Sequence, residues 1–121
     1  MWFFLFAFSL FAETRIQVLH TSDIHSHFIN DSSPLKLGGV SRLKTKILSL
    51  QKRNENRLLL DAGDWTEGSI FFTLNSGEKN HELMQSMGFD AIVFGNHDWL
   101  AGPKEVYDAF KAADMQVPVL G

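Results

Sequence analysis

The sequence contains no cysteine, which excludes disulfide frameworks, zinc–thiolate sites and cysteine nucleophiles. It also has no excess of positive charge, because 11 Lys and Arg residues face 14 Asp and Glu residues, for a formal net charge of −3. No global basic field therefore exists to attract a nucleic acid polymer or an anionic membrane. Any metal ion must be bound by nitrogen and oxygen ligands, which favours zinc, manganese, iron or magnesium.

Long hydrophobic runs are also missing. The apolar run at residues 1–12, MWFFLFAFSLFA, is shorter than the roughly 20 residues that a membrane-spanning helix needs. Its length, and its end at the small residue Ala12, are typical of the apolar region of an export signal. We therefore expect residues 1–12 to be a signal peptide and the protein to be exported, to a periplasm or the extracellular space. The alternative is a buried N-terminal strand.

Residues 13–121 have the composition of one small globular domain. Hydrophobic residues make up 45% of the chain and charged residues 21%, which is ordinary for a folded protein. The chain is long enough for one domain with its own core and too short for two. We find no internal repeat and no low-complexity linker that would divide it.

Hydrophobic periodicity predicts strands that alternate with helices. Short apolar runs predict four strands, at residues 16–19, 57–62, 90–94 and 117–120. Apolar residues spaced by three and four predict three helices between them, at about 40–50, 78–87 and 103–113. The order β-α-β-α-β-α-β predicts an α/β fold with a mostly parallel sheet and right-handed crossovers. By its continuous apolar character, we expect the strand at 57–62 to be fully buried.

Polar clusters follow three of the predicted strands. Asp23 and His25 follow the first strand, Asp64 follows the second, and the run Asn96–Asp98 follows the third. In open α/β sheets, ligands bind beyond the carboxyl ends of the strands. We therefore expect the three clusters to meet at one edge of one sheet.

These residue types suit a site with two divalent metal ions. In Asp23-x-His25, an extended or turning backbone can aim both side chains at one ion, and the two oxygens of Asp64 can bridge two ions. Asn96 offers a neutral carbonyl oxygen to the second ion. Two ions roughly 3.5–4 Å apart can hold the attacking and leaving oxygens of a phosphoryl transfer and lower the pKa of a bound water.

His97 and Asp98 are the predicted catalytic residues. An imidazole at this place can stabilise developing charge or protonate a leaving alkoxide, and Asp98 could orient it. Glycines stand directly before Asp64 and Asn96, where they allow sharp turns and close approach of the backbone.

Other polar residues near these motifs favour ordinary structural roles. We expect His20 to be structural, His27 to be exposed in a loop and His81 to lie on the surface of its helix. Glu67 could contact a metal ligand without binding the ion itself, although a solvent-facing position in a loop is favoured. Asp61 is expected to end its strand with a hydrogen bond to the backbone.

The motifs DIH at 23–25, GD at 63–64 and GNHD at 95–98 resemble the first three blocks of the calcineurin-like metallophosphoesterases. Their surroundings, VLHTSDIHSHF, GDWTEGS and GEKNHELMQSMGFDAIVFGNHDW, resemble the 5′-nucleotidase family within that superfamily. The resemblance extends from about Ile16 to Gly121. It implies that residues 13–121 form half of a metallophosphoesterase-type α/β sandwich.

The resemblance also implies roles for single residues. Asp23 and His25 would bind one divalent metal ion, and Asp64 would bridge it to a second. Asn96 would bind the second ion, and His97 would be the histidine that acts in the transition state. The implied substrate is a small phosphate ester, in the first place a nucleotide, hydrolysed outside the cytoplasm.

The chain departs from the family pattern in two ways. The aspartate that many 5′-nucleotidases carry three residues after the histidine is Leu100 here, so Asp98 or a later residue would have to replace it. No histidine follows His97, whereas the family supplies further metal ligands from downstream histidines. Our hypothesis is that the chain is the N-terminal part of the catalytic domain and is not an active enzyme by itself. The alternatives are a non-catalytic metal-binding or interaction module and a remnant without a stable fold.

Overall fold

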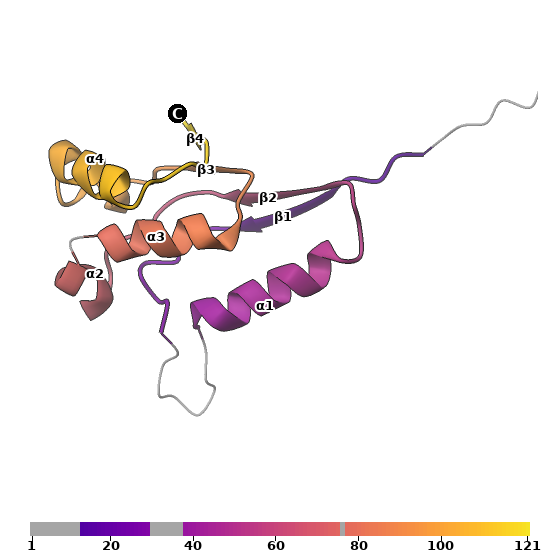
Figure 1. The fold of residues 1–121 in the computed structure, drawn as a ribbon, viewed down its shortest axis with the longest axis horizontal. Helices are drawn as coiled ribbons and strands as arrows, with labels where there is room; N and C mark the ends of the chain where they lie inside the picture. Colours follow the sequence, from indigo (N-terminus) through magenta and orange to yellow (C-terminus); the bar gives the residue numbers. More distant parts are fainter. Residues whose placement is uncertain (1–12, 30–37, 76) are drawn as a thin grey trace, which may run out of the picture.

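The computed structural model describes residues 13–29, 38–75 and 77–121, so the expected signal peptide lies outside the described residues. Four parallel strands form one sheet in the order β1-β2-β3-β4 (Figure 1). The strands are β1 (Gln17–Thr21), β2 (Arg57–Asp61), β3 (Ala91–Val93) and β4 (Val119–Leu120). The predicted α/β class and parallel sheet are confirmed, although three of the four strands are shorter than the sequence indicated.

Helical segments connect successive strands. They are α1 (Val40–Gln51), α2 (Ile70–Asn75), α3 (Glu78–Met87), the 3-10 helix η1 (His97–Trp99) and α4 (Pro103–Ala112). The sequence predicted α1, α3 and α4 but neither α2 nor η1, because segments of six and three residues are too short to show a helical period. In the part of the chain that the structure describes, no helix combines the length and hydrophobicity needed to cross a membrane.

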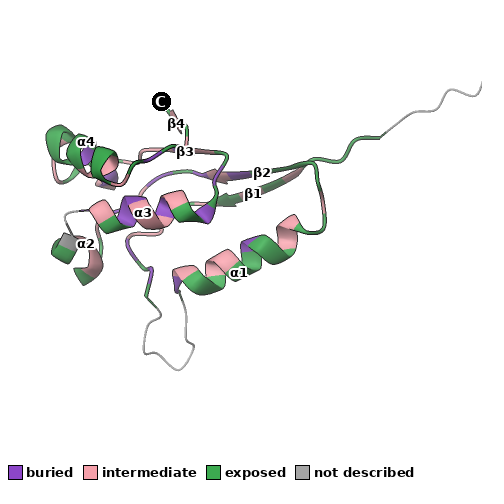
Figure 2. Ribbon diagram, viewed as in Figure 1, coloured by how far each residue is buried: buried purple, intermediate pink, exposed green. Residues whose placement is uncertain are grey.

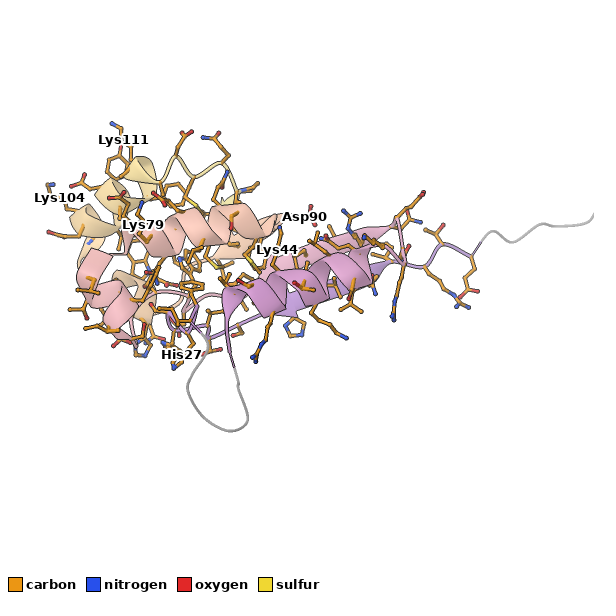
Figure 3. The ribbon with its side chains drawn as sticks, turned by 60° about the horizontal axis from the view of Figure 1, so that its bottom comes forward. His27, Lys44, Lys79, Asp90, Lys104 and Lys111 are labelled. Atoms are coloured by element: carbon orange, nitrogen blue, oxygen red, sulfur yellow. The ribbon has the colours of Figure 1, made fainter. Side chains whose placement is uncertain are left out.

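Local sequence signals set the ends of α3 and α4. Gly88 ends α3 in the left-handed conformation, with φ 80°, which costs glycine little. Pro103 occupies the first turn of α4, where its missing N–H is tolerated. Lys44 of α1 also supports the end of α3, because its Nζ donates hydrogen bonds to the carbonyls of Ser86 (2.8 Å) and Met87 (2.6 Å) (Figure 3).

The hydrophobic core lies between one face of the sheet and the helices. Leu59 of β2, Met84 of α3 and Trp65 are each 0% exposed, and Ile92 of β3 is 1% exposed. Buried positions gather on α3 and on the strands behind it (Figure 2). Strand order 1-2-3-4 explains this arrangement, because successive right-handed crossovers that advance in one direction place their helices on the same face.

The other face of the sheet is open to solvent within the described residues. Val18 and Leu58 are paired neighbours in β1 and β2, and they are 54% and 43% exposed. Leu120 of β4 is 56% exposed. The expectation that the strand at 57–62 is fully buried was therefore wrong, because only alternate residues of β2 face the helices.

Candidate metal centre at the carboxyl ends of the strands

Backbone hydrogen bonds align the loops that follow β1 and β2. The N–H of Asp23 donates to the carbonyl of Gly63, and the N–H of His25 donates to the carbonyl of Asp64, each at 2.9 Å. The first loop thus continues alongside the second beyond the end of the sheet. This pairing brings side chains that are about 40 residues apart in sequence to one place.

Asp23, His25 and Asp64 form a cluster of possible metal ligands. One donor atom from each lies within 4.8 Å of the others, and His25 Nε2 is 3.8 Å from Asp23 Oδ1. Asp23 is exposed, while the other two residues are half-buried, so the cluster is open to solvent on one side. Two carboxylates and an imidazole fit a first-row divalent cation or magnesium by their donor chemistry.

The loop after β3 is tied to this cluster through Asp64. Asp64 Oδ1 accepts a hydrogen bond of 2.8 Å from the backbone N–H of His97. Asn96 lies between β3 and η1 as an exposed residue. Its backbone carbonyl accepts a hydrogen bond from the backbone N–H of Trp99 at 3.4 Å. All three sequence clusters therefore meet at one edge of the sheet, with Asp64 in contact with both neighbouring loops.

The hydrogen bonds of Asp98 go to other groups than the His97 imidazole, which it could have oriented. Its carboxylate is 2% exposed and accepts hydrogen bonds from the backbone N–H groups of Asp64 (2.8 Å), Gly95 (2.9 Å) and Thr66 (2.9 Å). The hydroxyl of Thr66 donates a further hydrogen bond, at 2.9 Å. The residue therefore joins the second and third loops, and the expected contact with His97 is corrected.

Glu67 is the carboxylate that does meet the site histidines. Its Oε2 lies 3.1 Å from Nδ1 of His97 and 3.8 Å from Nδ1 of His25. The two imidazole rings meet edge to face, with centroids 4.8 Å apart. The Glu67 side chain keeps 35% of its surface exposed, and its contacts favour the alternative that it supports a metal ligand over a purely solvent-facing position. Its place three residues after Asp64, in the same loop, was the only signal in the sequence.

The site loops contain strained backbone. Non-glycine residues with positive φ cost of order 1–3 kcal/mol each and gather at functional sites. Of the six that occur in the described residues, five belong to the first two site loops: Asp23, His25, Ser26, Asp64 and Glu67. Hydrogen bonds between the loops offset this cost.

Two glycines allow the second and third loops to touch. A Cβ at Gly63, whose φ is 99°, would lie 2.5 Å from the backbone nitrogen of Gly95. A Cβ at Gly95 would overlap the carboxylate of Asp64. The close approach expected from the sequence is therefore present, and it depends on the absence of both side chains.

Asp61 lies beneath the site at the end of β2, 3% exposed. Its Oδ1 accepts a hydrogen bond of 2.9 Å from the N–H of Gly63, as expected, and the hydroxyl of Thr21 donates to its Oδ2. Burial raises the pKa of Asp61 from 3.8 to about 6, against the lowering effect of these two hydrogen bonds.

His81 is buried, 1% exposed, which corrects the expectation of a surface position. Its Nδ1 accepts a hydrogen bond of 3.2 Å from Nε1 of Trp65, and its ring meets Phe110 of α4 edge to face. Burial lowers the pKa of His81 from 6.5 to about 4, although the negative charge of Asp98 acts in the opposite direction.

The remaining histidines lie apart from the cluster. His20 is exposed on the face of the sheet that the helices leave open, opposite Leu60 in the register of β1 and β2. His27 is exposed as expected, its Nδ1 lies 3.2 Å from the carbonyl of Ile24, and its side chain stands at the outer edge of the molecule (Figure 3).

Residues 16–119 match the family model for calcineurin-like phosphoesterases. Among curated proteins, the chain is 34% identical to rat 5′-nucleotidase over 114 residues, which cover 88% of this chain and 20% of the rat protein. It is 38% identical to human 5′-nucleotidase over 93 residues, covering 70% of this chain and 16% of that protein. Snake venom 5′-nucleotidase from Gloydius brevicauda is 37% identical over 92 residues, with the same shares of the two chains.

Solved structures show the same similarity. NAD nucleotidase from Haemophilus influenzae matches with a TM-score of 0.74 and 28% identity, over 86% of this chain and 20% of that one. The 5′-nucleotidase precursor from Thermus thermophilus matches with a TM-score of 0.72 and 28% identity, over 86% and 21%. The chain thus spans about a fifth of the length of these proteins.

Proposed function

This chain belongs to the calcineurin-like phosphoesterase family, and we propose that it supplies part of the metal site of a phosphoester hydrolase of the 5′-nucleotidase type. The main support is the meeting of Asp23, His25 and Asp64 within 4.8 Å, beyond the ends of β1 and β2. Two carboxylates held this close repel one another, so a purely structural role does not account for the cluster.

In this proposal, Asp23 and His25 would bind one divalent cation and Asn96 a second. Asp64 would bind both cations. The donor set consists of carboxylate, imidazole and amide groups without thiolate, which fits zinc, manganese, iron or magnesium. Divalent cations in such a site neutralise the charge of a phosphoryl group and lower the pKa of water.

His97 is proposed to act on the phosphate ester itself. Its backbone is fixed to Asp64 by the 2.8 Å hydrogen bond, while its side chain keeps 39% of its surface exposed and is therefore accessible to a substrate. An imidazole in this place can stabilise the developing charge or protonate the leaving alkoxide. Asp98 is proposed to assist indirectly, by holding together the loops that carry Asp64 and His97.

We further propose that the substrates are nucleoside phosphates and that the protein acts outside the cytoplasm. The substrate class is supported by relatives named 5′-nucleotidase. Export is supported by the apolar segment at residues 1–12 and by a relative from snake venom. Because the chain spans about a fifth of the rat relative, this activity is proposed for the protein to which the segment belongs.

A second candidate function is a metal-binding module without catalysis. It is favoured by the donor groups of this chain, because three residues, Asp23, His25 and Asp64, gather around one possible cation position, whereas the proposed second cation shares Asp64 and adds Asn96. A module of this kind would bind one cation firmly and hydrolyse no phosphate ester.

Calorimetric titration with Mn²⁺ or Zn²⁺, followed by hydrolysis assays with AMP and bis(p-nitrophenyl) phosphate, tests the proposal when both are carried out on the complete protein to which this segment belongs. We expect Asp64→Asn to weaken the binding of both cations, because the carboxylate loses charge toward each. His97→Ala should leave cation binding near normal and lower hydrolysis by about 10²–10⁴-fold, the usual contribution of a positioned acid or base.

Three results would separate the hypotheses. Equal loss of cation binding in Asp64→Asn and His97→Ala would contradict the assigned roles. Firm binding of one cation without hydrolysis would favour the module, and absence of any divalent cation binding would reject both functions.

A further inference from the structure

We propose that Glu67 is a positioning residue, which fixes the tautomer of His97 by accepting a hydrogen bond from its Nδ1–H and which lies beside the Nδ1 edge of the His25 imidazole. The consequence for catalysis rests on the proposed function, but the arrangement itself can be measured without any reaction. The resemblance assigned no role to Glu67, and the positioning role follows from geometry.

The contact with His97 is a hydrogen bond by distance, at 3.1 Å between Oε2 and Nδ1. An ionised carboxylate only accepts hydrogen bonds, so the proton must lie on Nδ1 of His97. The neutral imidazole then has its lone pair on Nε2. That nitrogen is the one left to meet a phosphate ester.

His25 is placed between two acidic groups on opposite sides of its ring. Its Nδ1 is 3.8 Å from Glu67 Oε2, and its Nε2 is 3.8 Å from Asp23 Oδ1. Histidines that bind metals almost always donate their other ring N–H to a carboxylate, a carbonyl or water, which fixes the ring. The same carboxylate oxygen thus lies beside the Nδ1 atoms of both site histidines, and it is within hydrogen-bond distance of His97.

No other nearby carboxylate in the described residues takes this role. The carboxylate of Asp98 is occupied by hydrogen bonds to Asp64, Thr66 and Gly95. Leu100, which directly follows η1, has no polar side chain and is 60% exposed.

The backbone around Glu67 is shaped to bring it to the histidines. Glu67 has φ 62°, an uncommon conformation for a residue with a side chain. At Gly68, with φ 85°, a Cβ would lie 2.9 Å from both Cβ and the carbonyl oxygen of His25. The loop therefore packs directly against His25, and a larger residue at position 68 would push Glu67 away.

Long-range ¹H–¹⁵N correlation spectra of the metal-free chain test the proposal, because they distinguish the two tautomers of each imidazole. At about pH 8, His97 should show the Nδ1–H form. Glu67→Ala removes the acceptor without adding backbone strain, since both residues carry a Cβ. We expect His97 in this variant to shift to the mixture of tautomers that free imidazoles show.

Glu67→Asp and Glu82→Gln complete the experiment. The shorter Glu67→Asp keeps a carboxylate and should restore part of the Nδ1–H population of His97. Glu82 is a partly exposed residue of α3, paired with Lys79 at 2.6 Å, and Glu82→Gln removes one negative charge outside the site, so the spectrum should not change. A mixed tautomer of His97 in the unaltered chain, or an unchanged spectrum in Glu67→Ala, would overturn the proposal.

Titration with Mn²⁺ distinguishes a positioning residue from a metal ligand. Loss of a residue that orients a ligand typically weakens metal binding by about 10–100-fold without removing a site. We therefore expect Glu67→Ala to bind the same number of ions as the unaltered chain, more weakly. A reduced number of bound ions would show that Glu67 is itself a ligand, together with His25 and His97, and would reject the positioning role.

Discussion

At the scale of single residues, buried polar side chains hold the site loops in place. Asp98 joins the second and third loops through its carboxylate. Asn80 of α3 donates hydrogen bonds to the hydroxyl of Ser26 at 2.5 Å and to the carbonyl of Trp65 at 3.2 Å. Removing one partner from such a buried pair costs about 1–3 kcal/mol, so these residues restrict the loops to one arrangement.

The buried His81 predicts a dependence of stability on pH. Its pKa is about 4 in the folded protein, against 6.5 for an unperturbed histidine. Between these values the unfolded chain binds more protons than the folded one, so the contribution of His81 to stability falls as pH falls from about 6.5 to about 4. The loss approaches about 3 kcal/mol, at about 1.36 kcal/mol for each pKa unit.

Asp61 changes the stability of the folded protein in the opposite direction to His81, over nearly the same pH range. Because its pKa is raised from 3.8 to about 6, the folded protein binds more protons there, and its contribution is lost as pH rises. We therefore expect stability from urea unfolding to change little between pH 4 and 6, and His81→Gln to lose stability as pH rises. The exposed His20→Gln is the control, and an identical pH profile for His81→Gln and the unaltered chain would contradict the assignment.

At the scale of elements, successive residues of one strand lie on two different faces of the sheet, one packed against helices and one exposed to solvent. Leu59 of β2 is 0% exposed against the helices, whereas its neighbour Leu58 is 43% exposed on the open face. Parallel sheets usually have both faces covered. The apolar residues on the open face therefore contribute less to stability in this chain than their hydrophobicity suggests.

Leucine-to-alanine substitutions at these two positions test the one-sided core. Leu59→Ala should lower the free energy of unfolding by about 2–5 kcal/mol, through lost burial and the cavity that remains. Leu58→Ala should lower it by less than about 1 kcal/mol, because a partly exposed side chain leaves no cavity. Urea unfolding of both variants gives the comparison, and equal losses would show that the open face is covered in solution.

At the scale of the whole molecule, the proposed metal centre connects parts that are distant in sequence. Its residues come from the loops after β1, β2 and β3, so a cation bound there would link the first three strands of the sheet. A ligand that binds only the folded state stabilises it by about 2.7 kcal/mol at a concentration 100 times its Kd.

Thermal unfolding with and without Mn²⁺ tests this linkage. We expect Mn²⁺ to raise the Tm by several degrees and EDTA to reverse the effect. Asp64→Asn should reduce the shift, whereas Asp108→Asn, an exposed change on α4, should keep it. A Tm that does not respond to Mn²⁺ in the unaltered chain would contradict a metal centre that connects these loops.

The order of the main elements and the sheet edge that carries the candidate site could be predicted from the amino-acid sequence. Periodicity indicated the four strands and α1, α3 and α4, because a residue pattern reports directly which face is buried. The carboxyl ends of parallel strands share one edge of a sheet, so the meeting of Asp23, Asp64 and His97 followed from topology. Gly63 and Gly95 signalled the close approach of the loops, since no other residue fits there.

The contacts between side chains across that edge could not be predicted in the same way, because they depend on three-dimensional packing. The contact of Glu67 with His97 and the burial of His81 depend on how separate segments pack, and a one-dimensional pattern carries no such information. The direction of Asp98 likewise depends on backbone N–H groups from another loop. Among the described residues, strand order and crossover handedness place the helices on one face of the sheet and leave the other face open. The sequence could not show this, because local hydrophobicity shows that a strand is apolar but not which partners cover it.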